Sequence, residues 1–312
     1  MRAQEKQILL LRWGGIGDTL VIFPSVYLLR SHFSGYFFRM ICRQDVGSIF
    51  TLAGLIDQVI SPDDARVGEL FIKGREKVFF AAEKYFLIIG WFNHCPQLET
   101  FPGRSIIYEP QCGLPINQYF FLQTLRIVKG AVFQRKKCFE EFTRLPLSSE
   151  WLAEAEKWLP GDIFLGKKKA FGLICPGSGG REKCWPWESY FNLIEELAHE
   201  GIQGLVVTGP AEGDLWSGLK KNILPPGWFI YHCPPLWVVA AWMKMARFYV
   251  GNDSGLTHLA ALVGVPGVAL FLKKNLPVWK PGGKLRVLAQ TRLNRIPLFQ
   301  VKKMLIELGA LS

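Results

Sequence analysis

The sequence lacks long hydrophobic runs. No apolar stretch reaches the roughly 18 residues that a membrane-spanning helix needs. The two nearest, residues 20–29 and 260–272, are interrupted by proline or glycine. At the N-terminus, charged residues precede a short apolar segment without a cleavage site of small residues, so we expect a first β-strand there and not a signal peptide.

Cysteine motifs are also missing. The seven cysteines are scattered and odd in number, and no two have the spacing C-x-x-C, so neither a zinc site nor a disulfide framework is indicated. The pairs His94-Cys95 and His232-Cys233 each precede a proline, but a shared metal site would lack further ligands. We therefore expect no metal and no cofactor, and a reducing cytoplasm as the setting.

Acidic residues are too few to balance the basic ones. The chain has 37 lysines and arginines against 26 aspartates and glutamates, which gives a net charge of +11. This balance suits a phosphorylated substrate or an anionic membrane surface. No nucleic-acid-binding signature is present, so we expect no nucleic-acid partner. The 11 tryptophans and 23 phenylalanines favour peripheral contact with lipid.

The sequence does contain a repeated alternation of apolar strands with helical stretches. Apolar residues make up 49% of the 312 residues, enough for a sizeable core. Helices between the strands, among them one over 19–31, predict parallel sheets with helices on their faces. Strands are expected at 7–11, 36–42, 85–90, 105–108, 171–175, 204–208, 229–231, 248–250, 268–271 and 286–288.

The alternation restarts after the polar stretch 166–169, which follows a helix expected over 150–159. We place the domain boundary there, giving two Rossmann-like domains, residues 1–165 and 166–312. Their ligands would bind at the carboxyl ends of the strands, in a cleft between the domains. The final helix, 297–308, is expected to stay with the second domain or to pack back on the first.

Residues 248–266 read FYVGNDSGLTHLAALVGVP, which predicts a strand, a glycine turn and a helix. Gly251 and Gly255 allow positive φ and close backbone approach, while Asp253 and Ser254 can cap the helix. The free N–H groups at the helix start favour a phosphate site, which His258 can join from the first turn. Taken alone, the pattern equally suits a capped helix in an α/β core.

Another glycine-rich loop, WGGIGD at 13–18, follows the first strand. It approaches the dinucleotide motif G-x-G-x-x-G, but the sixth position is Leu20, and Arg43 follows the second strand in place of an acidic ribose ligand. A nicotinamide enzyme is therefore not favoured. Asp18 suits a helix N-cap, and equally a carboxylate that accepts a proton from an attacking hydroxyl. Gly17, beside it, is a candidate substrate contact.

Two further loops offer groups for a nucleotide. Loop 176–186, PGSGGREKCWP, combines glycine amides with the Ser178 hydroxyl and the cations Arg181 and Lys183, a set that suits a diphosphate. It lacks the spacing G-x-x-x-x-G-K-[ST], so a P-loop nucleotidase is not favoured. Glu212 in the next loop could accept both ribose hydroxyls, or simply begin a helix.

Together these motifs resemble glycosyltransferase family 9, the heptosyltransferases of the lipopolysaccharide inner core. The resemblance rests on the G-D turn with Pro24 in the following helix, then PGSG with K-x-W-P, then TGPAE, then GNDSGLTHLAALVGVP. The last element is specific, and the order matches over nearly the whole chain. The resemblance implies a GT-B fold, α/β with two Rossmann-like domains, in which the N-terminal domain mainly binds the acceptor and the C-terminal domain the nucleotide-sugar.

The resemblance also implies roles for individual residues. Asp18 corresponds to the general base, and Lys183 to the cation on the donor diphosphate. Other residues correspond to groups that contact the nucleotide-sugar, on the ribose or around the diphosphate: Ser178, Glu212, Asp253, Ser254, Gly255 and His258.

The activity implied is inverting, metal-independent transfer of a sugar, by default heptose from ADP-heptose, onto a phosphorylated glycolipid such as the lipid A core. Lys183 and the turn 251–258 would stabilise charge on the diphosphate, and closure of the cleft would bring Asp18 to the acceptor. Such an enzyme would be cytoplasmic and peripheral on the inner face of the inner membrane. Two alternatives stay open: a related transferase with another nucleotide-sugar or a non-lipid acceptor, and a non-catalytic nucleotide-binding protein.

Overall fold

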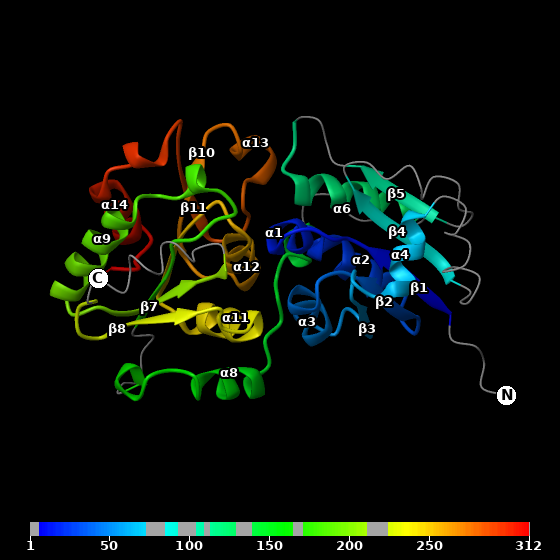
Figure 1. Ribbon diagram of the computed structural model, residues 1–312, viewed down its shortest axis with the longest axis horizontal. Coiled ribbons are helices and arrows are strands. Elements are labelled where there is room, and N and C mark those ends of the chain that lie inside the picture. The colour runs from blue at the N-terminus through cyan, green and yellow to red at the C-terminus, as the bar shows by residue number, and fades with distance from the viewer. Residues whose placement is uncertain are drawn as a thin grey trace. The chain divides into compact units, whose positions relative to one another are not determined.

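The chain divides into two compact units, Met1–Thr143 and Arg144–Ser312 (Figure 1). The computed structural model describes residues 6–72, 85–92, 104–108, 113–128, 139–164, 171–210 and 224–311. Within these ranges, no helix has both the length and the apolar character needed to cross a membrane.

The N-terminal unit contains a parallel sheet of five strands in the order β3-β2-β1-β4-β5. Its strands are β1 (Gln7–Leu11), β2 (Phe37–Ile41), β3 (Gln58–Ile60), β4 (Tyr85–Phe92) and β5 (Arg104–Tyr108). Its helices include α1 (Ile16–Leu20), α2 (Phe23–His32), α3 (Gln44–Leu52), α4 (Ala65–Gly68) and α6 (Ile116–Ile127). The strand order reverses between β1 and β4, the point at which open parallel sheets bind ligands.

The helix predicted over 19–31 is two helices, α1 and α2, with Pro24 in the first turn of α2. Proline has no N–H to donate, and its ring clashes with the carbonyl four residues earlier, so one continuous helix would be strained here. The break leaves Asp18 on a short helix directly after the glycine turn.

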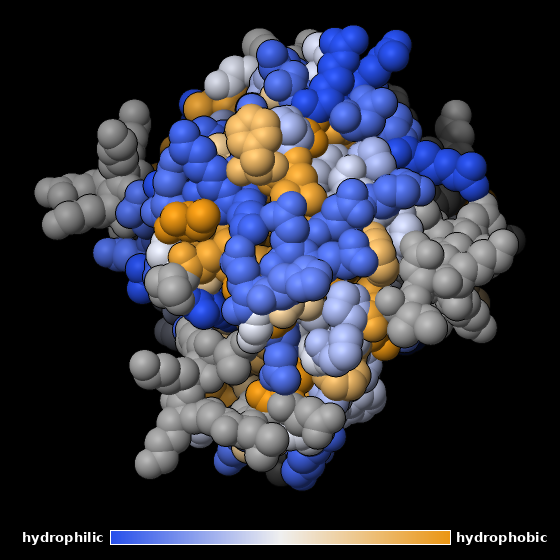
Figure 2. Space-filling view, turned by 90° about the vertical axis from the view of Figure 1, so that its left-hand side faces the viewer, coloured by the Kyte–Doolittle hydropathy of each residue, from blue (hydrophilic) through white to orange (hydrophobic). Residues whose placement is uncertain are grey.

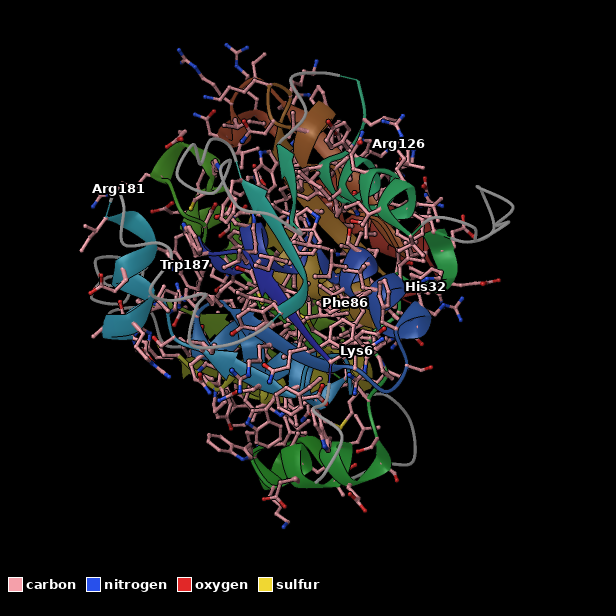
Figure 3. All side chains as sticks on the ribbon, turned by 90° about the vertical axis from the view of Figure 1, so that its right-hand side faces the viewer. Lys6, His32, Phe86, Arg126, Arg181 and Trp187 are labelled. Atoms are coloured by element: carbon pink, nitrogen blue, oxygen red, sulfur yellow. The ribbon has the colours of Figure 1, made fainter. Side chains whose placement is uncertain are left out.

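Near the amino ends of β1 and β4, aromatic rings pack against the ammonium group of Lys6. Lys6 Nζ lies 5.7 Å from the ring centroid of Tyr36 and 5.5 Å from that of Phe86, and Figure 3 shows Lys6 beside Phe86. Phe33 adds a ring contact with Phe86 at 6.0 Å. The cluster therefore packs at the amino ends of the strands, whereas Asp18 follows the carboxyl end of β1.

The C-terminal unit contains a parallel sheet of six strands in the order β11-β10-β9-β6-β7-β8. Its strands are β6 (Phe171–Cys175), β7 (Gln203–Thr208), β8 (Trp228–His232), β9 (Phe248–Asn252), β10 (Gly267–Leu272) and β11 (Leu285–Gln290). Its helices include α8 (Ser149–Glu156), α9 (Trp187–His199), α11 (Leu236–Met245), α12 (Gly255–Val263), α13 (Leu276–Trp279) and α14 (Leu298–Glu307). Strands β7 and β8 follow β6 in order toward one edge of the sheet. The chain then returns to the other side of β6, where β9, β10 and β11 follow toward the opposite edge, so the strand order reverses between β6 and β9.

The division between the units falls earlier than the predicted boundary at residue 165. Helix α8 belongs to the C-terminal unit, because Trp242 of α11 donates from Nε1 to the carbonyl of Ala155 at 3.1 Å. The Tyr231 hydroxyl also donates to the carbonyl of Trp158 at 2.8 Å. The predicted boundary relied on the polar stretch 166–169, and the sequence does not show that α8 contacts strands and helices beyond it.

Helix α14 packs within its own unit, against α9 and β10, and Val301 and Leu305 enter the core there. Helix α14 is therefore part of the compact C-terminal unit. Figure 2, which views the side bearing α9 and α14, shows mostly hydrophilic side chains with separate apolar ones between them. Phe299 and Ile306 of α14 are among the exposed apolar residues.

Candidate functional site

The reversal point of the C-terminal sheet brings two loops together. Strands β6 and β9 are hydrogen-bonded neighbours, so the loop after β6 (176–186) and the turn after β9 (253–254) leave the same edge side by side. The buried hydroxyl of Ser178 donates to the backbone carbonyl of Asp253 at 2.6 Å. The two loops that the motifs indicated are thus joined directly.

Asn252, the last residue of β9, organises both loops from a fully buried position. Its Oδ1 accepts from the N–H of Trp185 at 3.1 Å and from the hydroxyl of Tyr190 at 2.9 Å. Its Nδ2 donates to the carbonyl of Pro176 at 2.5 Å, and its backbone carbonyl accepts from the Thr257 hydroxyl. Both ends of the amide are used, which is why an amide suits this position.

We expect Asn252→Asp to destabilise the C-terminal unit by about 3 kcal/mol, because a carboxylate cannot donate to Pro176 and its charge would be buried. Burial favours the protonated acid in the folded state, so its pKa there lies above the unfolded value of about 3.9. The loss therefore grows as the pH rises above that value. Thermal melting at about pH 5 and about pH 8 measures it, with the exposed Asn294→Asp as control. Unchanged melting at the higher pH would exclude this role for Asn252.

Asp253 orders a cation at the same turn. Its buried Oδ2 accepts from Asn275 Nδ2 at 2.7 Å and lies 3.8 Å from Lys183 Nζ. The Lys183 side chain is 33% exposed, so its ammonium is held near the turn and is still open to a ligand. A diphosphate placed here would meet a fixed positive charge.

Helix α12 starts at Gly255, and Ser254 is its N-cap residue. The predicted side-chain cap is absent: within the described residues no side chain caps this helix, and the buried Ser254 hydroxyl makes no hydrogen bond there. The helix start therefore keeps N–H groups and the positive end of its dipole for an anion.

The glycine at 251 is required for close approach, and not for the positive φ that the sequence suggested. Neither Gly251 nor Gly255 has a positive φ. A Cβ on Gly251 would lie 2.1 Å from the hydroxyl of Tyr249, a fully buried side chain. Packing around this ring thus excludes any side chain at 251.

His258 lies in the first turn of α12, largely buried, with its ring 6.0 Å from that of Trp279 in an edge contact. The neighbouring Thr257 hydroxyl pairs with the Tyr249 hydroxyl at 2.9 Å. Burial raises the pKa of Tyr249 well above its usual value, so this phenol stays neutral and acts as a hydrogen-bonding partner. The His258 ring therefore packs against Trp279, one turn of α12 from the helix start at Gly255.

The reversal point of the N-terminal sheet carries Asp18, the third residue of α1. Its Oδ2 accepts from the N–H of Gly15 at 2.7 Å, and the side chain is 40% exposed. Gly14 has φ of 136°, and a Cβ there would lie 2.9 Å from Asp18 Oδ2, so the tight turn needs glycine. Gly17 lies within α1, where its carbonyl accepts from the N–H of Val21 at 3.1 Å. One carboxylate oxygen is therefore fixed, while Oδ1 accepts no hydrogen bond from the backbone of the described residues.

Arg12, which no motif indicated, connects the Asp18 turn to strand β4. The side chain is 4% exposed, and its Nε donates to the carbonyl of Asp18 at 2.7 Å. Nη1 donates to the carbonyl of Trp91 in β4 at 2.9 Å, and Nη2 lies 3.9 Å from Asp18 Oδ1. A charged residue at the end of an apolar strand, directly before a glycine turn, is the sequence signal that could have revealed it.

A hollow of about 520 Å³ opens at the carboxyl ends of β1, β2 and β3. Arg43 and Asp45 form a two-point ion pair in its wall, at 3.1 and 2.7 Å. This mixed lining, with the Trp13 ring beside charged and hydroxyl groups, suits a sugar, which has both apolar faces and hydroxyl groups. The lining residues are Trp13, Gly14, Arg43, Gln44, Asp45, Ser61, Pro62 and Asp63.

Glu212, the residue predicted to bind the ribose, lies outside the described residues, and so does the pair His94-Cys95. In the part of the chain that the structure describes, no three His, Cys, Asp or Glu side chains lie close enough to hold a metal ion. Metal independence remains a prediction.

A model of glycosyltransferase family 9 (heptosyltransferase) matches residues 131–305, more than half of the chain. A curated relative, lipopolysaccharide heptosyltransferase 3 of Escherichia coli (strain K12), is 27% identical over 123 residues, which are 38% of this chain and 35% of that protein. The chain thus aligns with about a third of the length of this relative.

Solved structures share the fold along nearly the whole chain. The family 9 glycosyltransferase from Veillonella parvula DSM 2008 has a TM-score of 0.78 at 17% identity, covering 100% of this chain and 99% of that one. The E. coli ADP-heptose lps heptosyltransferase II has a TM-score of 0.75 at 16% identity, covering 97% and 98%. The E. coli heptosyltransferase WaaC with ADP has a TM-score of 0.69 at 18% identity, covering 97% and 99%.

These structural matches and the two parallel sheets identify the fold as GT-B, as predicted. At such low identities the structural matches identify the fold alone, whereas the family model identifies the family. The chain belongs to glycosyltransferase family 9, the heptosyltransferase family.

Proposed function

We propose that the protein is an inverting, metal-independent glycosyltransferase that moves heptose from ADP-heptose to a hydroxyl of a phosphorylated glycolipid such as the lipid A core. The observation that carries the proposal is the reversal point of the C-terminal sheet, where Ser178, Lys183 and the start of α12 meet around Asp253. A cation, a hydroxyl and a helix N-terminus are groups that bind a diphosphate. A structure of the same fold holds ADP, which supports an adenine nucleotide as donor.

The reaction moves charge in two places. When the bond between the anomeric carbon and the diphosphate breaks, negative charge grows on the leaving phosphate, and Lys183 Nζ and the N–H groups at the start of α12 stabilise it. The acceptor hydroxyl attacks the same carbon from the opposite face and gives its proton to Asp18 Oδ1. The proposal therefore requires one residue set from each unit, and it assigns the ribose to Glu212.

The acceptor side rests on charge and on the hollow beside Gly14. A net charge of +11 favours a phosphorylated acceptor and an anionic membrane surface. We accordingly place the protein in the cytoplasm, peripheral on the inner face of the inner membrane. The hollow between Trp13 and Asp63 would hold a sugar of the acceptor within reach of the glycine turn.

Calorimetric titration without added metal tests the donor assignment. We expect ADP to bind in the micromolar range and UDP, GDP, CDP and NAD to bind at least about 10-fold more weakly, a difference of about 1.4 kcal/mol. A preference for UDP or GDP would keep the diphosphate site and remove ADP-heptose. Binding of NAD alone, or of no nucleotide, would overturn the proposed function.

A further inference from the structure

Three side chains at the carboxyl ends of β7 and β8 form a nucleophile, a base and an orienting group. Cys233 directly follows β8 and is exposed, and its Sγ lies 3.4 Å from Nε2 of His232. Nδ1 of the same ring lies 3.1 Å from Oγ1 of Thr208, the last residue of β7. Thr208 and His232 are register partners in the sheet, so the backbone itself places them together.

The two ring nitrogens of His232 face different groups. Nδ1 lies 3.1 Å from the Thr208 hydroxyl, and this hydroxyl also lies 3.4 Å from the carbonyl of Tyr231, to which it can donate. With the proton on Nδ1, Nε2 presents its lone pair to the thiol. An imidazole oriented by a third group and facing a thiol is the arrangement that activates a cysteine.

The backbone holds the thiol at this position. The N–H of Cys233 donates to the carbonyl of Thr208 at 2.8 Å. Cys233 has φ of 52°, a left-handed conformation that is uncommon for any residue other than glycine. Pro234 and Pro235 follow and limit the backbone on the other side. The thiol is therefore fixed beside the ring at the sheet edge.

The other described cysteines have different surroundings. Cys42 and Cys175 are buried, and burial, with Asp45 nearby, raises the pKa of the Cys42 thiol to about 12. Cys184 is half-buried, and its Sγ lies 3.5 Å from the carbonyl of Gly180, to which it donates. Among the cysteines that the structure describes, Cys233 combines exposure with a neighbouring base.

We propose that Cys233 is an activated thiol that undergoes thiol–disulfide exchange with small disulfides. Nε2 of His232 takes the thiol proton, and the thiolate attacks one sulfur of the disulfide. The S–S bond of the reagent breaks as the new S–S bond forms on Cys233, and the departing thiolate takes up the proton from the imidazolium. Attack by a second thiol reverses the modification.

A group attached to Cys233 by the exchange would affect nucleotide binding. Strands β7 and β8 end at the edge of the sheet that also carries the Lys183 loop, and Gly209 begins the loop that leads to Glu212. A group attached to Cys233 would stand at this edge and obstruct a nucleoside there. Only this consequence rests on the proposed function; the reactivity of the thiol does not.

The test is the reaction of the full chain with the aromatic disulfide DTNB at about pH 6.5, followed by release of the coloured thiolate. An ordinary thiol, with a pKa near 8.5, is about 1% ionised at this pH, so we expect Cys233 to react at least about 10-fold faster than such a thiol. Cys233→Ser should lose the fast phase, whereas the matched Cys184→Ser should keep it. A fast phase that persists in Cys233→Ser overturns the proposal.

Two variants test the role of the imidazole. His232→Gln should slow the fast phase by about 10-fold and make its rate rise with pH as for a simple thiol. Thr208→Val keeps thiol and imidazole, removes the orienting hydroxyl and should slow the phase to a smaller extent. Equal melting temperatures show that the variants are folded, and an unchanged rate in folded His232→Gln overturns the activation.

ADP separates this proposal from the proposed function. If saturating ADP slows the fast phase, the nucleoside lies at the same edge and both proposals are supported. If the phase is fast but indifferent to bound ADP, the activated thiol stands and the predicted obstruction of the nucleoside is wrong.

Discussion

Asp18→Asn is expected to slow sugar transfer by roughly 10²–10⁴-fold, the contribution of a general base. An amide oxygen at position 18 can still accept from the N–H of Gly15, so the glycine turn keeps its geometry, but an amide cannot take up the acceptor proton. The loss should fall on kcat, while ADP binding stays as in the wild type because the residues that we propose bind the diphosphate belong to the other unit. Initial rates with ADP-heptose and calorimetry with ADP measure the two quantities.

Asp64→Asn is the matched control for this substitution. Asp64 is the N-cap of α4 in the same unit and accepts from the N–H of Arg66 at 2.9 Å. Asparagine caps a helix about as well as aspartate, so fold and transfer rate should both be unchanged. A normal transfer rate in Asp18→Asn would show that another group removes the proton.

Lys183→Met is expected to weaken ADP binding and to slow transfer by about 10²–10³-fold, because the leaving diphosphate loses a fixed positive charge. Methionine keeps much of the length of the side chain. Asp253 keeps its hydrogen bond from Asn275, so the turn should stay in place. Lys183→Arg retains the charge with a different geometry and should recover part of the loss. Calorimetry with ADP and initial transfer rates give both effects.

An exposed lysine of the same unit separates this effect from a general loss of positive charge. Lys303 on α14 lies 4.0 Å from Glu307 and is largely exposed, a setting in which an ion pair contributes little. Lys303→Met should therefore bind ADP as the wild type does. Wild-type ADP affinity in Lys183→Met would remove the diphosphate from this loop.

Much of the fold could be predicted from the order of apolar runs and turns. Strand β6 and helix α9 lie where the sequence placed them, because glycine and proline bound them clearly. Strand β3 was missed because three residues are too few to show a period of two. The break before Pro24 was missed because the apolar pattern continues through it, although proline itself marks such breaks.

Part of the candidate site could likewise be predicted from the sequence, and part could not. Local motifs indicated Ser178, Lys183 and Asp253, and the structure brings these three together. Asn275 could not be predicted, since it reaches Asp253 from 22 residues away through the loop after β10. The cap expected at Ser254 is absent, because its hydroxyl is buried without a hydrogen bond to the described residues, a placement that local sequence preference does not contain.

The hydrogen bonds that fix the turn after β9 all lie inside the C-terminal unit: Ser178 to Asp253, Asn252 to Pro176, and Asn275 to Asp253. The residues that make these bonds all lie in the second half of the chain, so substitutions in the first half leave their donors and acceptors in place. On the proposed function, in which the N-terminal unit binds the acceptor, a lineage that keeps the second half intact can acquire new acceptors by divergence of the first. The family model that matches this chain begins at residue 131, close to the division between the units.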